Sequence, residues 1–193
     1  HPQLTMSVPS RDDIIARMAR TMYGPGVLNN THRGDVVEVM VLEALGPDWN
    51  FVGLGWHPWD LQRGSGDERV RIQVKQVAAL QVWGPTKRMT LTFNWSTRPP
   101  SDFERYNSGE AIESEGWFCD VFVFGLHRET DVFVADHTDV RQWAFLVIPT
   151  SDLRHGRSSM VLSKALVNWE LVGWTALPEA VDNAIDRLED ASS

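Results

Sequence analysis

Apolar and polar residues alternate along the run of residues 69–77, strictly so as far as Lys75. Because successive side chains of a strand point to opposite faces, this alternation predicts a half-buried β-strand. The face with the β-branched residues should pack into a core. The opposite face should carry three polar side chains, Arg71, Gln73 and Lys75.

Apolar residues at helical spacing predict three helices. The first should cover residues 11–23, with Ser10 as its N-cap and two acids in its first turn. The second should run from about residue 33 to residue 45, where Gly-Pro follows. The third should cover residues 178–190.

The remaining apolar segments predict further strands. They lie at residues 51–56, 89–95, 117–126, 131–135 and 143–148. Residues 117–126 are nearly all apolar, which favours a central strand covered on both faces. Residues 96–116 are polar and predict a long loop or a broken helix.

Helices interspersed with strands, without a repeat or a linker, predict a single α/β domain with a mixed sheet flanked by helices. We expect this domain to cover residues 6–193. Met6 precedes an ordinary-looking start, so His1 to Thr5 are expected to be an extension added to the native chain.

The overall net charge of −8 argues against a protein that coats nucleic acid generally, because phosphate contacts need cations. The charge is unevenly distributed, however. Residues 61–105 hold eight basic and four acidic residues, a net charge of +4, so the rest of the chain carries −12. This local excess suits a site that contacts phosphate, although a solvated polar face would produce the same bias.

One cysteine, Cys119, excludes an internal disulfide and a zinc site built from several cysteines. It falls in an apolar segment and is expected to be buried and inert. No apolar run approaches the roughly 18 residues of a membrane span, so a cytoplasmic protein is expected. Phosphate-binding loops and dinucleotide fingerprints are absent from the sequence, and no organic cofactor is expected.

Three short motifs follow one another in a distinctive order. Gly34 and Glu38 share the second predicted helix, Pro58-Trp59-Asp60 follows a strand, and Gln73-Val74-Lys75 occupies the alternating strand. This order resembles the PD-(D/E)XK, or restriction-endonuclease-like, nuclease superfamily in its Gln-x-Lys variant, over about residues 30 to 150. The resemblance implies a restriction-endonuclease-like core, Mg²⁺ (or Mn²⁺), DNA as partner and a possible homodimer.

The chemistry of these residues suits phosphodiester hydrolysis, which needs an activated water and stabilisation of phosphoryl charge. Asp60 would be the principal ligand of Mg²⁺, an ion that prefers oxygen donors. Gln73 would add its amide oxygen, and Glu38 would bind directly or through water. Lys75 would orient or help deprotonate the attacking water. Glu38, Asp60, Gln73 and Lys75 are therefore the expected catalytic residues.

Each of these residues also has an ordinary structural interpretation. Asp60 could cap a turn after Pro58, and Lys75 could be a charge that protects a sheet edge. Glu38 could be a solvated helix residue, with Glu43 on the same helix as the rival candidate. Gln73 replaces an acid, which leaves open a catalytically inactive module that binds nucleic acid or a protein partner.

Other polar residues are weaker candidates. His32 and Arg33 open the second helix, where the helix dipole favours phosphate. Arg63 and Arg71 belong to the basic segment around the expected site. Residues 154–157, Arg-His-Gly-Arg, could form a loop that contacts nucleic acid. Residues 136–139, Asp-His-Thr-Asp, look like a metal cluster, but a turn explains them better.

Overall fold

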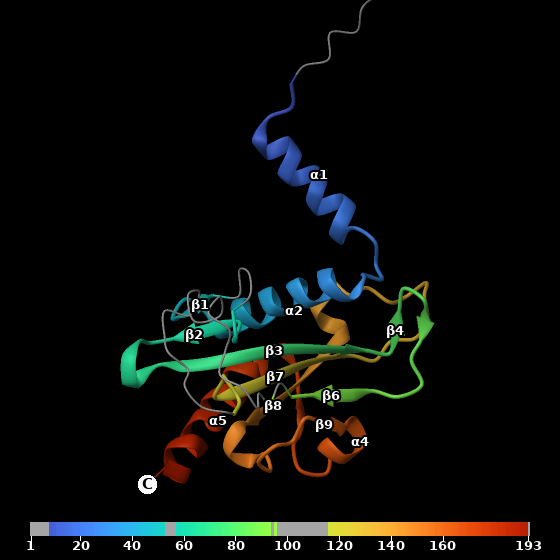
Figure 1. Ribbon diagram of the computed structural model, residues 1–193. Coiled ribbons are helices and arrows are strands. Elements are labelled where there is room, and N and C mark those ends of the chain that lie inside the picture. The colour runs from blue at the N-terminus through green and yellow to red at the C-terminus, as the bar shows by residue number, and fades with distance from the viewer. Residues whose placement is uncertain (1–7, 53–56, 94, 96–115, 193) are drawn as a thin grey trace, which may run out of the picture.

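The computed structural model describes residues 8–52, 57–93, 95 and 116–192 (Figure 1). They build a single α/β domain around one six-stranded sheet. In spatial order its strands are β1 (Trp49–Phe51), β2 (Leu61–Arg63), β3 (Val70–Ala78), β7 (Val121–His127), β8 (Trp143–Pro149) and β10 (Leu171–Val172). β3 and β7 run parallel and the other neighbours antiparallel, so the prediction of a mixed sheet is confirmed.

Two helices cover one face of this sheet. Val37 and Val41 of α2 (Asn30–Leu45) and Val181 of α5 (Leu177–Ser192) pack on the apolar face of β3 and its neighbours. α2 begins three residues before the predicted start, because the side chain of Asn29 accepts a hydrogen bond from the N–H of His32 and caps the helix. The core predicted for this face is therefore present.

The helix predicted at residues 11–23 is confirmed as α1 (Arg11–Tyr23). The Ser10 hydroxyl accepts from the N–H of Asp13, and the Asp13 carboxylate accepts from the N–H of Ser10, which forms a capping box. None of its residues is buried. Figure 1 shows α1 projecting beyond α2, away from the sheet.

Small elements cover the opposite face of the sheet. Its own core contains Phe122 and Phe124 of β7, and Leu91 packs on them from outside the sheet. The covering elements are β6 (Thr90–Thr92), β9 (Ser159–Val161) and α4 (Leu162–Ala165). A separate two-stranded ribbon consists of β4 (Leu80–Gln81) and β5 (Gly84–Pro85). The described residues also form four 3₁₀ helices: η1 (Gly66–Glu68), η2 (Val140–Gln142), η3 (Thr150–Asp152) and η4 (Trp174–Ala176).

The strand predicted at residues 131–135 is wrong, since this segment is a turn. The N–H groups of Val134 and Ala135 both donate to the carbonyl of Asp131, and the Asp131 carboxylate accepts from the N–H of Phe133. Short acidic side chains that bond nearby N–H groups favour turns over ladders. Three apolar residues of this segment, Val132, Phe133 and Val134, are solvent-exposed, with Phe133 at 94%.

Other boundaries differ in smaller ways. The strand expected at residues 51–56 is β1 and ends at Phe51, while residues 53–56 lie outside the described part of the chain. β6 is shorter than the predicted 89–95. The prediction for 96–116 falls almost entirely outside the described residues. In the part of the chain that the structure describes, no helix is long and apolar enough to cross a bilayer.

Gly125 sets how closely α2 approaches the sheet. A Cβ added there would lie 2.6 Å from Cγ1 of Val37 and 3.2 Å from Cε3 of Trp143. We expect Gly125→Ala to lower the free energy of unfolding by about 1–3 kcal/mol, the usual cost of overpacking a core. Gly34→Ala is the matched control, because an added Cβ on that α2 residue meets no atom within 4 Å. It should raise stability by about 0.5–1 kcal/mol. Denaturant unfolding measures both, and equal effects would contradict this packing.

Candidate active site

Asp60 immediately precedes β2 and extends the pairing of β2 with β3 by one residue. Its N–H donates to the carbonyl of Ile72 at 2.9 Å, as in a normal ladder. Its side-chain Oδ2 then accepts from the N–H of Val74 at 2.7 Å, so a carboxylate replaces the next backbone partner. The side chain thus bonds β3 rather than the turn that contains Pro58, and it is fixed beside the Gln73-Val74-Lys75 motif.

Three ionisable groups from three elements interact around this point. Burial raises the pKa of Asp60 to about 6, against the opposing effects of the Val74 N–H and the Lys75 ammonium. Burial also raises the pKa of Glu38 to about 8; nearby Asp60 and Asp35 raise it further, and Lys75 opposes the rise. Burial lowers the pKa of Lys75, and the electrostatic interactions with Asp60, Cys119 and Glu38 oppose this decrease. Two carboxyl groups and one amine therefore share a poorly solvated environment.

Glu43, the rival of Glu38, faces elsewhere. It is exposed and lines a cavity of about 560 Å³ with Tyr23, Val39 and Trp174. Glu38 is half-buried and interacts with Asp60 and Lys75. Of the two glutamates, α2 therefore directs Glu38 to the expected site.

Gln73 and Lys75 lie on the same face of the sheet, opposite the face covered by α2. They are paired in parallel register with Phe122 and Phe124 of β7, which belong to the second core. Gln73 is 8% exposed. Cys119 is buried beside this region, as expected, and burial raises the pKa of its thiol, which disfavours the reactive thiolate.

The donor set suits a hard divalent cation. The described residues contain no group of three or more His, Cys, Asp or Glu side chains that could hold a metal ion. Two carboxylates and the Gln73 amide nevertheless supply oxygen donors, which Mg²⁺ prefers, and this ion usually retains several waters. The raised pKa values show that ionising both acids here is costly without a compensating charge. A bound cation would supply that charge.

Two residues predicted to contact nucleic acid are engaged inside the protein. Arg33 is 1% exposed, and its guanidinium donates to the side chains of Asn30, Gln76 and Gln81. The expectation of a phosphate contact is therefore corrected, since this side chain ties α2 to β3 and β4. Arg71 forms a two-point ion pair with Asp120, with contacts of 3.0 and 2.8 Å.

The other two predicted contacts lie nearer the surface. Arg63 pairs with Asp182 at 3.1 Å and lies 5.0 Å from the centre of the Trp49 ring. His32 is half-buried, with its ring 5.2 Å from that of Tyr23.

Asp120 was not identified from the sequence as a partner of Arg71. Its position as the one acid in an apolar segment could have indicated that it needs a basic partner, which is Arg71.

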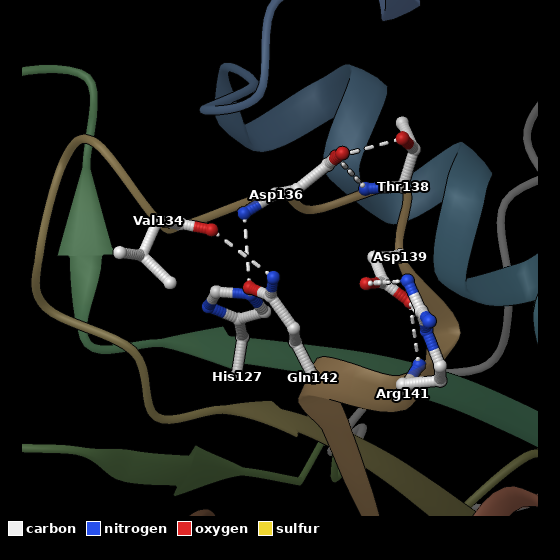
Figure 2. Close-up of polar contacts among 7 residues, drawn as sticks. All are labelled: His127, Val134, Asp136, Thr138, Asp139, Arg141 and Gln142. Atoms are coloured by element: carbon white, nitrogen blue, oxygen red, sulfur yellow. Dashed lines mark hydrogen bonds and ion pairs between the residues drawn. The ribbon is translucent and has the colours of Figure 1, made fainter.

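The residues at 136–139 form a turn, as expected (Figure 2). The Asp136 carboxylate accepts from the N–H and hydroxyl of Thr138, and the Asp139 carboxylate accepts from Arg141. His137 points inward and is fully buried. Its Nδ1 accepts from the N–H of Leu28 at 3.0 Å, so it anchors this turn to the segment before α2.

No protein-family model and no curated protein matches the sequence. Among solved structures, the chain is similar to a bacterial homing endonuclease, I-Ssp6803I, with a TM-score of 0.38 and 16% sequence identity. The similarity covers 68% of this chain and 76% of that one.

Proposed function

We propose that this protein is a divalent-metal-dependent nuclease that hydrolyses phosphodiester bonds in DNA, built as a Gln-x-Lys variant of the PD-(D/E)XK class. The observation that supports this most directly is the electrostatic coupling of Glu38, Asp60 and Lys75, which come from a helix, a strand end and a neighbouring strand. Burying such groups together costs stability, which is typical of a functional site rather than of a structural one.

In this proposal each residue has a defined role. Asp60 and Glu38 provide carboxylate oxygens for Mg²⁺ or Mn²⁺, and Gln73 provides its amide oxygen. The bound metal would polarise phosphate and lower the pKa of water. The Val74 N–H fixes the Asp60 carboxylate, so only one of its oxygens is fully available. Lys75, whose pKa is lowered, orients or deprotonates the attacking water and offsets negative charge. Two copies acting as a homodimer would cut both strands of a duplex.

The alternative is a catalytically inactive module that retains the fold to bind nucleic acid or a protein. Gln73 favours it, because an amide in place of an acid leaves the site with less negative charge to hold a cation. Binding of DNA without cleavage in Mg²⁺ and in Mn²⁺ would select this alternative.

Glu38 and Glu43 provide a matched test on one helix. With plasmid and oligonucleotide duplexes and Mg²⁺ or Mn²⁺, the wild type should cleave DNA. Glu38→Gln should reduce cleavage by about 10- to 100-fold, as for a group that binds or orients a metal. Glu43→Gln should retain wild-type activity, since Glu43 is exposed and outside the site. Equal traces of cleavage in all preparations would indicate a contaminant and would contradict the proposal.

A further inference from the structure

Two segments outside the proposed site are strongly basic. Residues 86–93 and 154–165 contain no aspartate or glutamate, in a chain whose net charge is −8. They contain five cations: Lys87, Arg88, Arg154, Arg157 and Lys164. A dense positive surface on an acidic protein indicates attraction of a polyanion.

The fold joins these segments into one antiparallel ribbon. Thr90 pairs with Val161 and Thr92 with Ser159, and the N–H of Phe93 extends the pairing to the carbonyl of Ser158 at 2.8 Å. Leu91, between the two threonines, is fully buried. Because side chains alternate across a strand, the hydroxyls of Thr90, Thr92 and Ser159 lie on the exposed face.

Three basic side chains lie beside this hydroxyl-bearing face. Arg88, Arg157 and Lys164 line a concavity of about 300 Å³ together with Thr90 and Ser159. None of the three side chains forms a hydrogen bond or ion pair with another described residue. The acid that precedes the second segment, Asp152, is already neutralised by Arg187 at 2.8 Å.

The ribbon lies on the same side of the large sheet as Gln73 and Lys75 of the proposed site. Leu91 and Phe93 pack on Phe122 and Phe124. These two phenylalanines are in register with Gln73 and Lys75 on β3. Figure 1 shows β6 and β9 below the sheet, on the side away from α2. A ligand on the exposed face of the ribbon therefore lies on the same side of the sheet as Lys75, with the ribbon between the ligand and Phe122 and Phe124.

We propose that this basic ribbon, residues 86–93 and 154–165, binds the phosphate backbone of duplex DNA. Arginine, lysine and hydroxyl side chains are the groups that contact phosphate oxygens, and such contacts position a duplex without reading its sequence. The choice of DNA among polyanions rests on the proposed function, because the ribbon lies beside the nuclease site. The ribbon holds the duplex backbone while Glu38, Asp60 and Lys75 act on it.

The experiment measures binding without cleavage. Full-length protein is titrated into a fluorescently labelled 30-base-pair duplex in EDTA, at several salt concentrations. Each phosphate contact contributes about 0.9 to the slope of log K against log salt. The triple variant Arg88→Gln, Arg157→Gln, Lys164→Gln should lower that slope by about 2 to 3 and weaken binding by about 10- to 100-fold at low salt. Circular dichroism confirms that the variants are folded.

A second triple variant controls for the total charge. Arg11→Gln, Arg17→Gln and Arg20→Gln remove the same three charges from exposed positions on α1. This variant should keep the wild-type slope. Equal slopes for wild type and both variants, or equal losses in both variants, would overturn the ribbon as the binding surface. Binding of anionic lipid vesicles by the wild type without binding of the duplex would also overturn it.

The two proposals fail separately. A wild type whose binding depends on the ribbon but that cleaves nothing with Mg²⁺ or Mn²⁺ supports the ribbon and contradicts the nuclease. A wild type that cleaves DNA, with an unchanged affinity in the ribbon variant, supports the nuclease and contradicts the ribbon.

Discussion

Asp60→Asn should reduce Mg²⁺-dependent cleavage of DNA by at least about 1,000-fold, equivalent to about 4 kcal/mol of transition-state stabilisation. The substitution removes the charge of the principal proposed metal ligand but retains an oxygen that can accept from the Val74 N–H at the same place. The local structure is therefore preserved while the affinity for the cation falls. Steady-state cleavage of a labelled duplex measures the loss.

Thermal unfolding separates this functional loss from a folding defect. Burial raises the pKa of Asp60 from 3.8 to about 6, so its ionisation destabilises the metal-free protein increasingly between these pH values and fully above pH 6. At pH 8 in EDTA, Asp60→Asn should therefore unfold at the same temperature as the wild type or higher. Asp48→Asn, at an exposed position, is the control and should leave cleavage unchanged. A variant that loses activity only together with its folded structure would contradict the assignment.

The sequence predicts the fold correctly where local signals, such as capping and periodicity, favour the same secondary structure as burial in the folded protein. Residues 69–75 alternate because one face of β3 packs under α2, and the strand predicted at 69–77 matches β3 to within one residue at each end. α1 was equally clear because its capping box and periodicity are local features. The prediction of a strand at residues 131–135 was wrong because the Asp131 carboxylate accepts a hydrogen bond from the N–H of Phe133. This local bond favours a turn over strand pairing, despite the apolar pattern.

The site was only partly predictable for a geometric reason. Glu38 and Glu43 are five residues apart, or about 140° around a helix of 3.6 residues per turn. Only one can face the sheet edge, and the sequence alone does not orient the helix. The packing of Val37 and Val41 on the sheet resolves the choice by turning Glu38 toward Asp60.

Arg33 shows the limit of a purely local interpretation. A cation at a helix N-terminus suggests phosphate binding, but its partners Gln76 and Gln81 are more than 40 residues away in the chain. These contacts exist only after β3 and β4 have formed. Long-range partners of this kind decide whether a charged residue serves ligand binding or packing.

Acidification should destabilise the protein through His137. Burial lowers the pKa of this residue to about 4; the charges of His127 and Arg33 act in the same direction, and the charge of Asp136 opposes them. As the pH falls below the ordinary value of 6.5, the unfolded chain takes up a proton that the folded protein excludes, so stability is lost until about pH 4. The loss should approach about 3 kcal/mol, or about 6–12 °C in a domain of this size.

A pair of asparagine variants isolates this contribution from other titrating groups. His137→Asn cannot be protonated but can still accept from the Leu28 N–H that anchors the turn in Figure 2. The wild type should be the more stable at pH 7, because asparagine fills less of the buried space, and its advantage should shrink by several degrees at pH 4.5. His155→Asn, at an exposed position, should differ from the wild type equally at both pH values. A constant gap for His137→Asn between pH 7 and pH 4.5 would mean that the folded protein binds a proton there as readily as the unfolded chain.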